Sequence, residues 1–180
     1  MTKTDEALGF AAEFDTPVGY MARIRAYYLA LGYDNPYRWA HYASVPFTAL
    51  AKPLNRSRIA LVTTAAPYQP GKGDQGPGAT YNASAKFYAV YSGDSAGDPD
   101  LRISHVGYDR LHTTAEDINS YLPLVQLRAA ATRGRIGSVA QHFHGAPTNR
   151  SQVTTIEQDC PDILARIRED QADAAIIVAN

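Results

Sequence analysis

The sequence predicts an α/β fold with a parallel or mostly parallel sheet and helices on both faces. Two observations predict it. In the second half of the chain, short apolar runs alternate with helical segments in the order strand, helix, strand, helix, strand, the pattern of a parallel α/β sheet. Hydrophobic residues make up 45% of the 180 residues, a globular composition that can bury a core. We therefore expect a Rossmann-like arrangement, with residues 1–16 as an N-terminal extension and residues 17–180 as a single α/β domain.

The first predicted helix begins near Pro17. Thr16 is a suitable N-cap, and Pro fits the first helical position. The apolar residues that follow recur at spacings of three and four and so share one helix face: Tyr20, Met21, Ile24, Tyr28 and Leu31. Gly32 is a natural end for this helix, because glycine readily adopts the left-handed conformation found after helices.

The remaining elements are predicted from apolar runs, periodicity and turn residues. A buried strand of the parallel type is expected at residues 58–64, followed by a long loop rich in Gly and Pro. The other expected elements are strands at residues 86–91 and 101–106, a helix at 123–133, a strand at 136–143, a helix at 161–171 that starts with Pro, and a closing buried strand, AAIIVA.

The predicted topology places three loops at one edge of the sheet. Right-handed crossovers bring the carboxyl ends of parallel strands to the same edge, and ligands of open α/β sheets bind outside those ends. The loops that begin near Thr63, His142 and Asn180 are therefore expected to line the ligand site.

Composition excludes several classes of protein. The chain has 17 basic and 18 acidic side chains, so no large surface for polyanions and no nucleic-acid partner are expected. No stretch approaches the roughly 20 apolar residues of a membrane helix, and the first 20 residues lack a signal-peptide core. The single Cys160 rules out an internal disulfide and a Cys-only zinc site. These features predict a cytoplasmic protein without a membrane partner.

A polar cluster lies in the segment His105–Asn119, HVGYDRLHTTAEDIN. His112, Asp109 and Asp117 could form a general acid/base set or ligate a metal. The same residues also fit a capping role, because Thr113 and Glu116 match a capping box and Asp117 then favours a helix N-terminus. Both interpretations stay open.

His142 and His144 form a second cluster. Residues two apart on a strand point the same way, so both imidazoles could meet one metal ion. Two ligands are too few for a zinc site, and His112, Asp109 or Glu116 would have to complete it. The alternative is an ordinary pair at the end of a strand, and no metal ligands are assigned.

Segments distributed along the chain resemble the selenoprotein B family of glycine/sarcosine/betaine reductases. The resemblance is strongest to short members, which include the smaller subunit of D-proline reductase. It runs in order from about Pro17 to Asn180, through PVGYMARIRAYYLALGYDNPYRWAHY, VPFTALAKPL, RIALVTTAAP, YDRLHTTAEDIN with YLPL, GRIGSVA and DAAIIVAN.

The resemblance implies a subunit of an oxidoreductase that reductively cleaves a C–N bond in a small amino-acid-like substrate. Thiols supply the electrons, a second reductase subunit carries a carbonyl group, and an oligomeric assembly is expected. His112 and Asp117 match the family's recurrent block and are predicted to orient the substrate or move protons. Substrate-binding roles are predicted for Asp109, Asn119, Thr63, Thr64 and His144.

The family's nucleophile is expected immediately after Asn180. In the family, the strand that matches DAAIIVAN is followed by a Cys or a selenocysteine, and a selenocysteine codon can be read as a stop. We therefore expect this chain to be truncated just before the nucleophile, to lack the C-terminal part of its domain, and to be inactive alone. No cofactor is expected within the chain itself.

Two other functions stay open from the sequence. One is a metal-dependent hydrolase, lyase or isomerase that uses His112, His142, His144 and an acidic residue. The other is a non-catalytic binding subunit, which would expose apolar surface that a partner covers.

Overall fold

The structure is a computed structural model, and it describes residues 19–32, 43–44, 47–103, 115–147 and 151–179. The chain divides into two units, Met1–Val45 and Pro46–Asn180, and each is considered by itself. The expected domain boundary at residue 17 stays a prediction. Among the described residues, no helix has both the length and the apolar character needed to cross a membrane.

The first unit contains α1 (Tyr20–Ala30). The helix is followed by Gly32 with φ of 85°, which confirms the predicted end. Ile24 and Tyr28 of the predicted apolar face are half-buried, and none of the described α1 side chains is buried. The predicted cap, Thr16, and Pro17 lie outside the described residues.

The second unit is built on β1 (Arg58–Thr63), whose residues 59–63 are all buried. β5 (Ser138–Val139) and β6 (His142–Gly145) pair with it in parallel, as does β7 (Ala174–Val178). β3 (Tyr91–Asp94) pairs antiparallel with β6. The α/β class is thus confirmed, whereas the sheet is mixed rather than purely parallel and a Rossmann-like arrangement is not confirmed.

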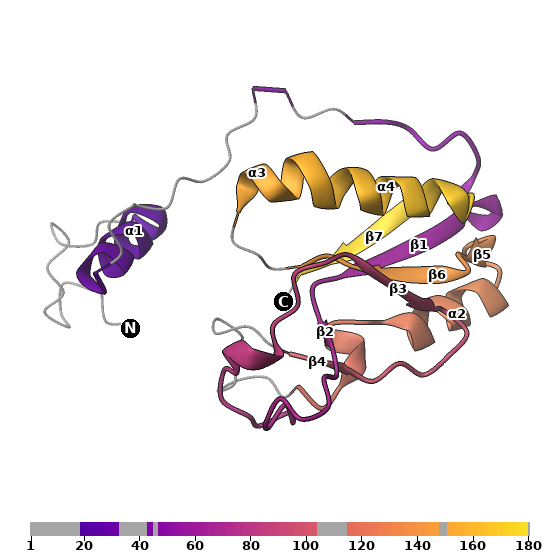
Figure 1. Cartoon of the computed structure of the whole chain (residues 1–180). Helices are drawn as coiled ribbons and strands as arrows, with labels where there is room; N and C mark the ends of the chain where they lie inside the picture. Colours follow the sequence, from indigo (N-terminus) through magenta and orange to yellow (C-terminus); the bar gives the residue numbers. More distant parts are fainter. Residues whose placement is uncertain (1–18, 33–42, 45–46, 104–114, 148–150, 180) are drawn as a thin grey trace, which may run out of the picture. The chain divides into compact units, whose positions relative to one another are not determined.

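Helices lie on both faces of this sheet (Figure 1). α2 (Leu124–Thr132) confirms the predicted helix, and its Leu124 and Leu127 join a core with Ile59, Leu61 and Phe143 from the strands. The other face carries a continuous helical run of α3 (Gln152–Thr154), a π-helical turn η6 (Thr155–Asp159) and α4 (Cys160–Glu169).

This helical run begins earlier than predicted. Pro161 is predicted at the first turn of its helix, yet the helix begins at Gln152. Its N-cap is Ser151, whose Oγ accepts a hydrogen bond from the Thr154 amide at 3.2 Å. Pro161 has no N–H to donate. It is the second residue of α4, and only Cys160 separates it from the π-helical turn, a local irregularity in the hydrogen-bond ladder where such a residue is tolerated.

Two predicted strands differ in the structure. Residues 86–90 are irregular, and the Gln69 side chain donates to the Ala85 and Lys86 carbonyls at their start. The strand expected at 101–106 is reduced, in the described residues, to β4 (Leu101–Arg102). It pairs with β2 (Ala66–Pro67) in a separate two-stranded sheet.

The predicted strand at 136–143 is divided into β5 and β6, and the closing strand is more exposed than expected. Five residues of β7 pair with β1, but Ile176 is 43% and Ile177 71% exposed. The expectation of a fully buried strand in mid-sheet is wrong for the described residues, because β7 has β1 on one side only.

The short 3-10 turns complete the unit: η3 (Leu54–Arg56), η4 (Ala83–Ala85) and η5 (Ile118–Ser120). Of these, η5 matters most for the site, because it lies in the segment that links the polar cluster of the sequence to α2.

Candidate functional site

The carboxyl ends of β1 and β7 meet at one edge of the sheet. The Thr64 amide donates to the Val178 carbonyl at 3.3 Å. The buried Thr63 hydroxyl donates to the Tyr121 carbonyl at 2.6 Å and accepts from the Ala65 amide at 3.1 Å. These bonds attach the segment around Tyr121 to the edge where the sequence predicts ligand binding.

Asp117 and Asn119 lie in this attached segment. Asp117 Oδ1 accepts from the Asn119 amide and from Asn119 Nδ2, both at 2.9 Å, and thereby caps η5. This capping is the structural alternative that the sequence left open for Asp117. The Asn119 Oδ1 atom is buried and has no hydrogen-bond partner among the described residues. His112 and Asp109 lie outside the described residues.

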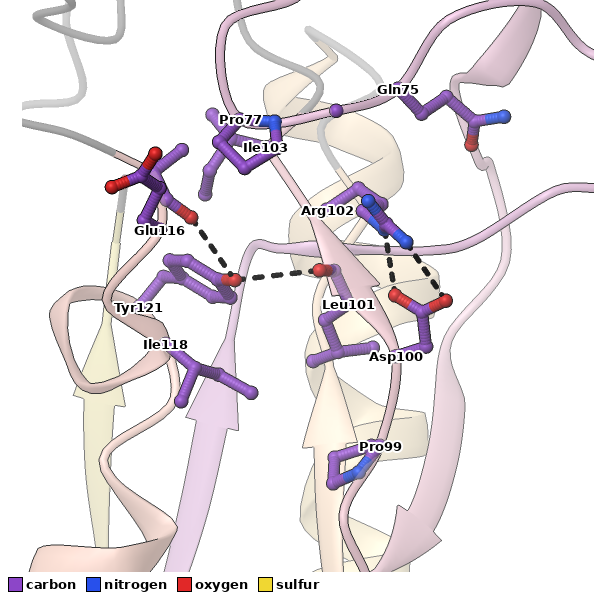
Figure 2. Close-up of a pocket in the computed structure, with 12 residues that line it drawn as sticks. Gln75, Pro77, Pro99, Asp100, Leu101, Arg102, Ile103, Glu116, Ile118 and Tyr121 are labelled. Atoms are coloured by element: carbon purple, nitrogen blue, oxygen red, sulfur yellow. Dashed lines mark hydrogen bonds and ion pairs between the residues drawn. The ribbon is translucent and has the colours of Figure 1, made fainter.

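A pocket of about 250 Å³ adjoins the same segment. Its walls come from the long Gly/Pro-rich loop, from β4 and its flanks, and from the start of η5 (Figure 2). The lining residues are Gln75, Gly76, Pro77, Pro99, Asp100, Leu101, Arg102, Ile103, Ala115, Glu116, Ile118 and Tyr121.

The pocket carries charges of both signs. Arg102 binds Asp100 in a two-point ion pair, with Nε–Oδ1 at 2.6 Å and Nη2–Oδ2 at 3.0 Å. This hydrogen bonding to Asp100 raises the pKa of Arg102 above its usual value. The guanidinium carbon also lies 5.0 Å from the centre of the Tyr68 ring, a cation–π contact. Arg102 is therefore a fixed cation at the pocket wall.

Tyr121 and Glu116 add two polar groups to the pocket lining. The Tyr121 hydroxyl lies 3.4 Å from the Leu101 carbonyl and 3.5 Å from the Ala115 carbonyl, both long for a hydrogen bond. Glu116 is exposed, so its carboxylate can reach a ligand through water. A cation and two acids around a small polar space can bind a zwitterion at both of its ends.

Sequence reasoning missed Asp100, Arg102 and Tyr121 as site residues, and it considered Glu116 only as a metal ligand. The available signal was the Asp-Leu-Arg sequence at the start of the predicted strand 101–106. An acid and a base two residues apart on a strand point to the same face and can pair.

His144 lies away from this pocket. It pairs in register with Val62, whereas the neighbouring position pairs with Thr63, and adjacent strand positions face opposite sides of a sheet. The side chain is 1% exposed, and its Nδ1 lies 2.9 Å from Ser92 Oγ. The structure therefore separates His144 from the other predicted binding residues.

Asp170, the residue that caps the C-terminus of α4, lies next to both His142 and His144. Asp170 Oδ1 lies 2.8 Å from His142 Nδ1, and Asp170 Oδ2 lies 3.8 Å from His144 Nε2. Burial lowers the pKa of His144, and the nearby Asp170 opposes that shift only in part. No group of three or more His, Cys, Asp or Glu side chains suited to a metal ion occurs among the described residues.

Comparison with known proteins gives one family and one relative. Residues 31–180 match the family described as glycine/sarcosine/betaine reductase selenoprotein B. The chain is 23% identical over 148 residues to the glycine reductase complex component B subunit gamma of Symbiobacterium thermophilum, covering 82% of this chain and 34% of that protein. The chain thus spans about a third of the length of this curated relative. No solved structure matches the chain.

Proposed function

Because the chain belongs to the glycine/sarcosine/betaine reductase selenoprotein B family, we propose that it is a subunit of a thiol- or selenol-dependent reductase. Its reaction is the reductive cleavage of a C–N bond in a small amino-acid-like substrate. The observation that carries this proposal is the family match over residues 31–180. The relative's name, a glycine reductase complex component, supports action together with other subunits.

The pocket beside η5 is the proposed binding site of the substrate. Arg102 is suited to the carboxylate of an amino acid, and Glu116 and Asp100 to its amine or ammonium group. Asn119 keeps the substrate-binding role that the resemblance implies, although it is not one of the residues that line the pocket. A volume of about 250 Å³ suits a small substrate.

The nucleophile of the proposed reaction is the Cys or selenocysteine predicted after Asn180. Hydrogen bonds link the end of β7 to Thr64, and Thr63 to Tyr121 of the pocket wall. This connection supports a nucleophile at the same sheet edge as the substrate. A thiolate or selenolate there would attack the substrate and be released by thiol exchange.

The remaining roles are proposed from the resemblance. His112 and Asp117 orient the substrate or move protons, and Asp109 lies in the same segment of the sequence. Thr63 and Thr64 hold the sheet edge against the pocket segment through their hydrogen bonds. A carbonyl-bearing second subunit, a thiol reductant, an oligomeric assembly and a cytoplasmic location complete the proposal.

The test is a thiol-dependent assay of the complete protein with its partner subunits. Glycine, sarcosine, betaine and D-proline are each supplied with dithiothreitol. The released amine, or for the cyclic D-proline the ring-opened amino acid, is measured together with thiol oxidation. Reductive cleavage consumes two thiol groups for each C–N bond cleaved. Amine release without matching thiol oxidation, or no reaction with any of the four substrates, would overturn the proposed activity.

Variants of Arg102 test the proposed pocket. Arg102→Gln removes the cation but keeps a polar side chain, so the KM for the substrate should rise at least tenfold, equivalent to about 1.4 kcal/mol of binding. Arg133→Gln is the matched control, because Arg133 is exposed beyond the end of α2 and is not a pocket residue. Equal KM values for the two variants would place the substrate elsewhere.

A further inference from the structure

Ser92 lies in an arrangement that resembles an activated serine. Its Oγ is 2.9 Å from His144 Nδ1, and Arg166 Nη1 donates to the same oxygen at 2.9 Å. The other ring nitrogen of His144 faces Asp170 Oδ2 at 3.8 Å. Serine, histidine and carboxylate thus follow one another, with a guanidinium beside the hydroxyl.

The charged groups around Ser92 and His144 favour one placement of the protons. A guanidinium can only donate, so the Arg166 hydrogen occupies a lone pair of Ser92 Oγ. The Asp170 carboxylate lies 3.8 Å from Nε2 and favours the neutral tautomer with its hydrogen on that nitrogen, which leaves Nδ1 to accept the Ser92 hydrogen. Nε2 is buried and has no hydrogen-bond partner among the described residues.

Burial divides the cluster into a sheltered base and an accessible hydroxyl. The His144 side chain is 1% and the Asp170 side chain 8% exposed, whereas Ser92 is exposed. The separation of 3.8 Å between His144 and Asp170 is an ion-pair distance, and such distances often shorten only when a ligand binds. His142 Nδ1 and amide hold the same carboxylate in place at 2.8 and 2.9 Å.

We propose that Ser92 is a nucleophile toward small carboxylic esters, with His144 as its general base, Asp170 as the group that orients the base, and Arg166 as the cation beside the reacting oxygen. This site is independent of the pocket at Arg102 and of the reductase function. Nucleophile, base and orienting group in sequence are the general signature of covalent catalysis by serine.

The reaction at this site balances without an external oxidant or reductant. Ser92 Oγ bonds to the acyl carbon while its proton passes to His144 Nδ1. The ester C–O bond then breaks, and the leaving alcohol takes that proton or departs as its anion. Water repeats the sequence on the acyl-serine and releases the carboxylic acid. Arg166 also binds Asp162 through Nε and Nη2 at 2.7 and 3.1 Å. Its Nη1 is placed to stabilise negative charge that develops during the first addition.

The experiment uses p-nitrophenyl acetate with the full chain. We expect a burst of p-nitrophenol and an acetyl group that peptide mapping by mass spectrometry locates on Ser92, at a rate at least tenfold above other serines. Ser92→Ala should abolish the burst. Ser84→Ala is the matched control, since Ser84 is also an exposed serine, and in the described part of the chain its hydroxyl bonds to the loop groups Lys72 O and Asn82 Oδ1 and to no histidine.

The pH profile distinguishes a base-assisted serine from an ordinary one. The rate of Ser92 acetylation should increase as the pH is raised and should already be constant by pH 6.5, because His144 is neutral there. The acetylation rate of an unassisted hydroxyl keeps increasing at higher pH. Ser92→Cys, which alters only an exposed side chain, should retain acylation at this position. Acetyl groups spread over many serines or lysines, a burst that persists in Ser92→Ala, or a profile without a plateau would each overturn the proposal.

Discussion

His144 is a histidine that the fold keeps neutral. It is almost wholly buried, and burial lowers its pKa below the usual 6.5 despite the nearby Asp170, with Arg166 and His142 opposing protonation as well. On unfolding, the ring regains its ordinary pKa and takes up a proton more readily. The unfolded state therefore binds more protons than the folded state at pH values below about 6.5.

This difference predicts a pH dependence of stability. The contribution of His144 should be fully present above pH 6.5 and should be lost as the pH falls from there toward its folded pKa. Thermal unfolding between pH 7.5 and 5 measures it. His144→Asn, which keeps a polar group near the Nδ1 position, should show a smaller loss of Tm on acidification. Parallel curves for the variant and the wild type would contradict this origin of the acid sensitivity.

At the scale of elements, β3 and β6 pair rings against glycines. Tyr91 is opposite Gly145, and Gly93 is opposite Phe143. A Cβ at Gly145 would collide with the Tyr91 ring, and one at Gly93 would collide with the Phe143 ring. The two rings contact each other edge to face, with centroids 6.2 Å apart, and Tyr91 donates to the Ala65 carbonyl at 2.8 Å. The absence of side chains at Gly93 and Gly145 therefore leaves the room in which the two aromatic rings pack.

Gly145→Ala should destabilise the protein by about 1–3 kcal/mol, the usual cost of overpacking a core. Chemical denaturation measures the loss. Gly78→Ala is the control, because a Cβ there meets no atom within 4 Å and Gly78 has no positive φ. In the Tyr91→Ala background the added cost of Gly145→Ala should largely vanish. Equal costs in both backgrounds would show that the ring is not the obstacle.

The elements also show what the sequence can and cannot predict. The ends of β1, α2 and β7 were predicted within a few residues, because each element has a pattern in its own sequence. β1 and β7 are apolar runs rich in strand-forming residues, and the apolar residues of α2 recur with the period of a helix. The irregular segment at 86–90 was predicted as a strand, since its amino acids favour one. The carbonyls at its start, of Ala85 and Lys86, are bound by the Gln69 side chain, a contact 16 and 17 residues away that no local pattern encodes.

The same limit applies to the candidate site. Thr63 and Thr64 were placed at the sheet edge correctly, because the end of a buried strand defines that edge. The pocket depends on the two-stranded sheet formed by β2 and β4. These strands are too short to show the alternation of polar and apolar residues by which a strand is predicted. Arg102 and Tyr121 could therefore be found only in three dimensions.

At the scale of the whole molecule, the buried hydrophobic residues of the described part of the chain all fall in the unit Pro46–Asn180. They run from Ile59 to Phe143. The described side chains of α1 include none that is buried. The second unit is therefore expected to be stable without residues 1–45.

Removal of residues 1–45 should leave the Tm of the remaining unit within a few degrees of that of the full chain. Differential scanning calorimetry of the two proteins measures this directly. Circular dichroism gives the control, since the shortened protein should retain the helical signal of α2 and α4. A shortened protein that unfolds much earlier, or that does not fold, would show that the first unit contributes to the core.

The position of β1 has a consequence for synthesis on the ribosome. β1 is the most buried strand of the sheet, yet all its partners begin at Ser138 or later. At about 5–20 residues per second, roughly 4–15 s pass between the synthesis of Thr63 and that of Ser138. During this interval an apolar strand has no neighbour with which to pair. Slow translation or low temperature during expression would lengthen the exposure, so the yield of folded protein should depend on chaperones that shield a nascent chain.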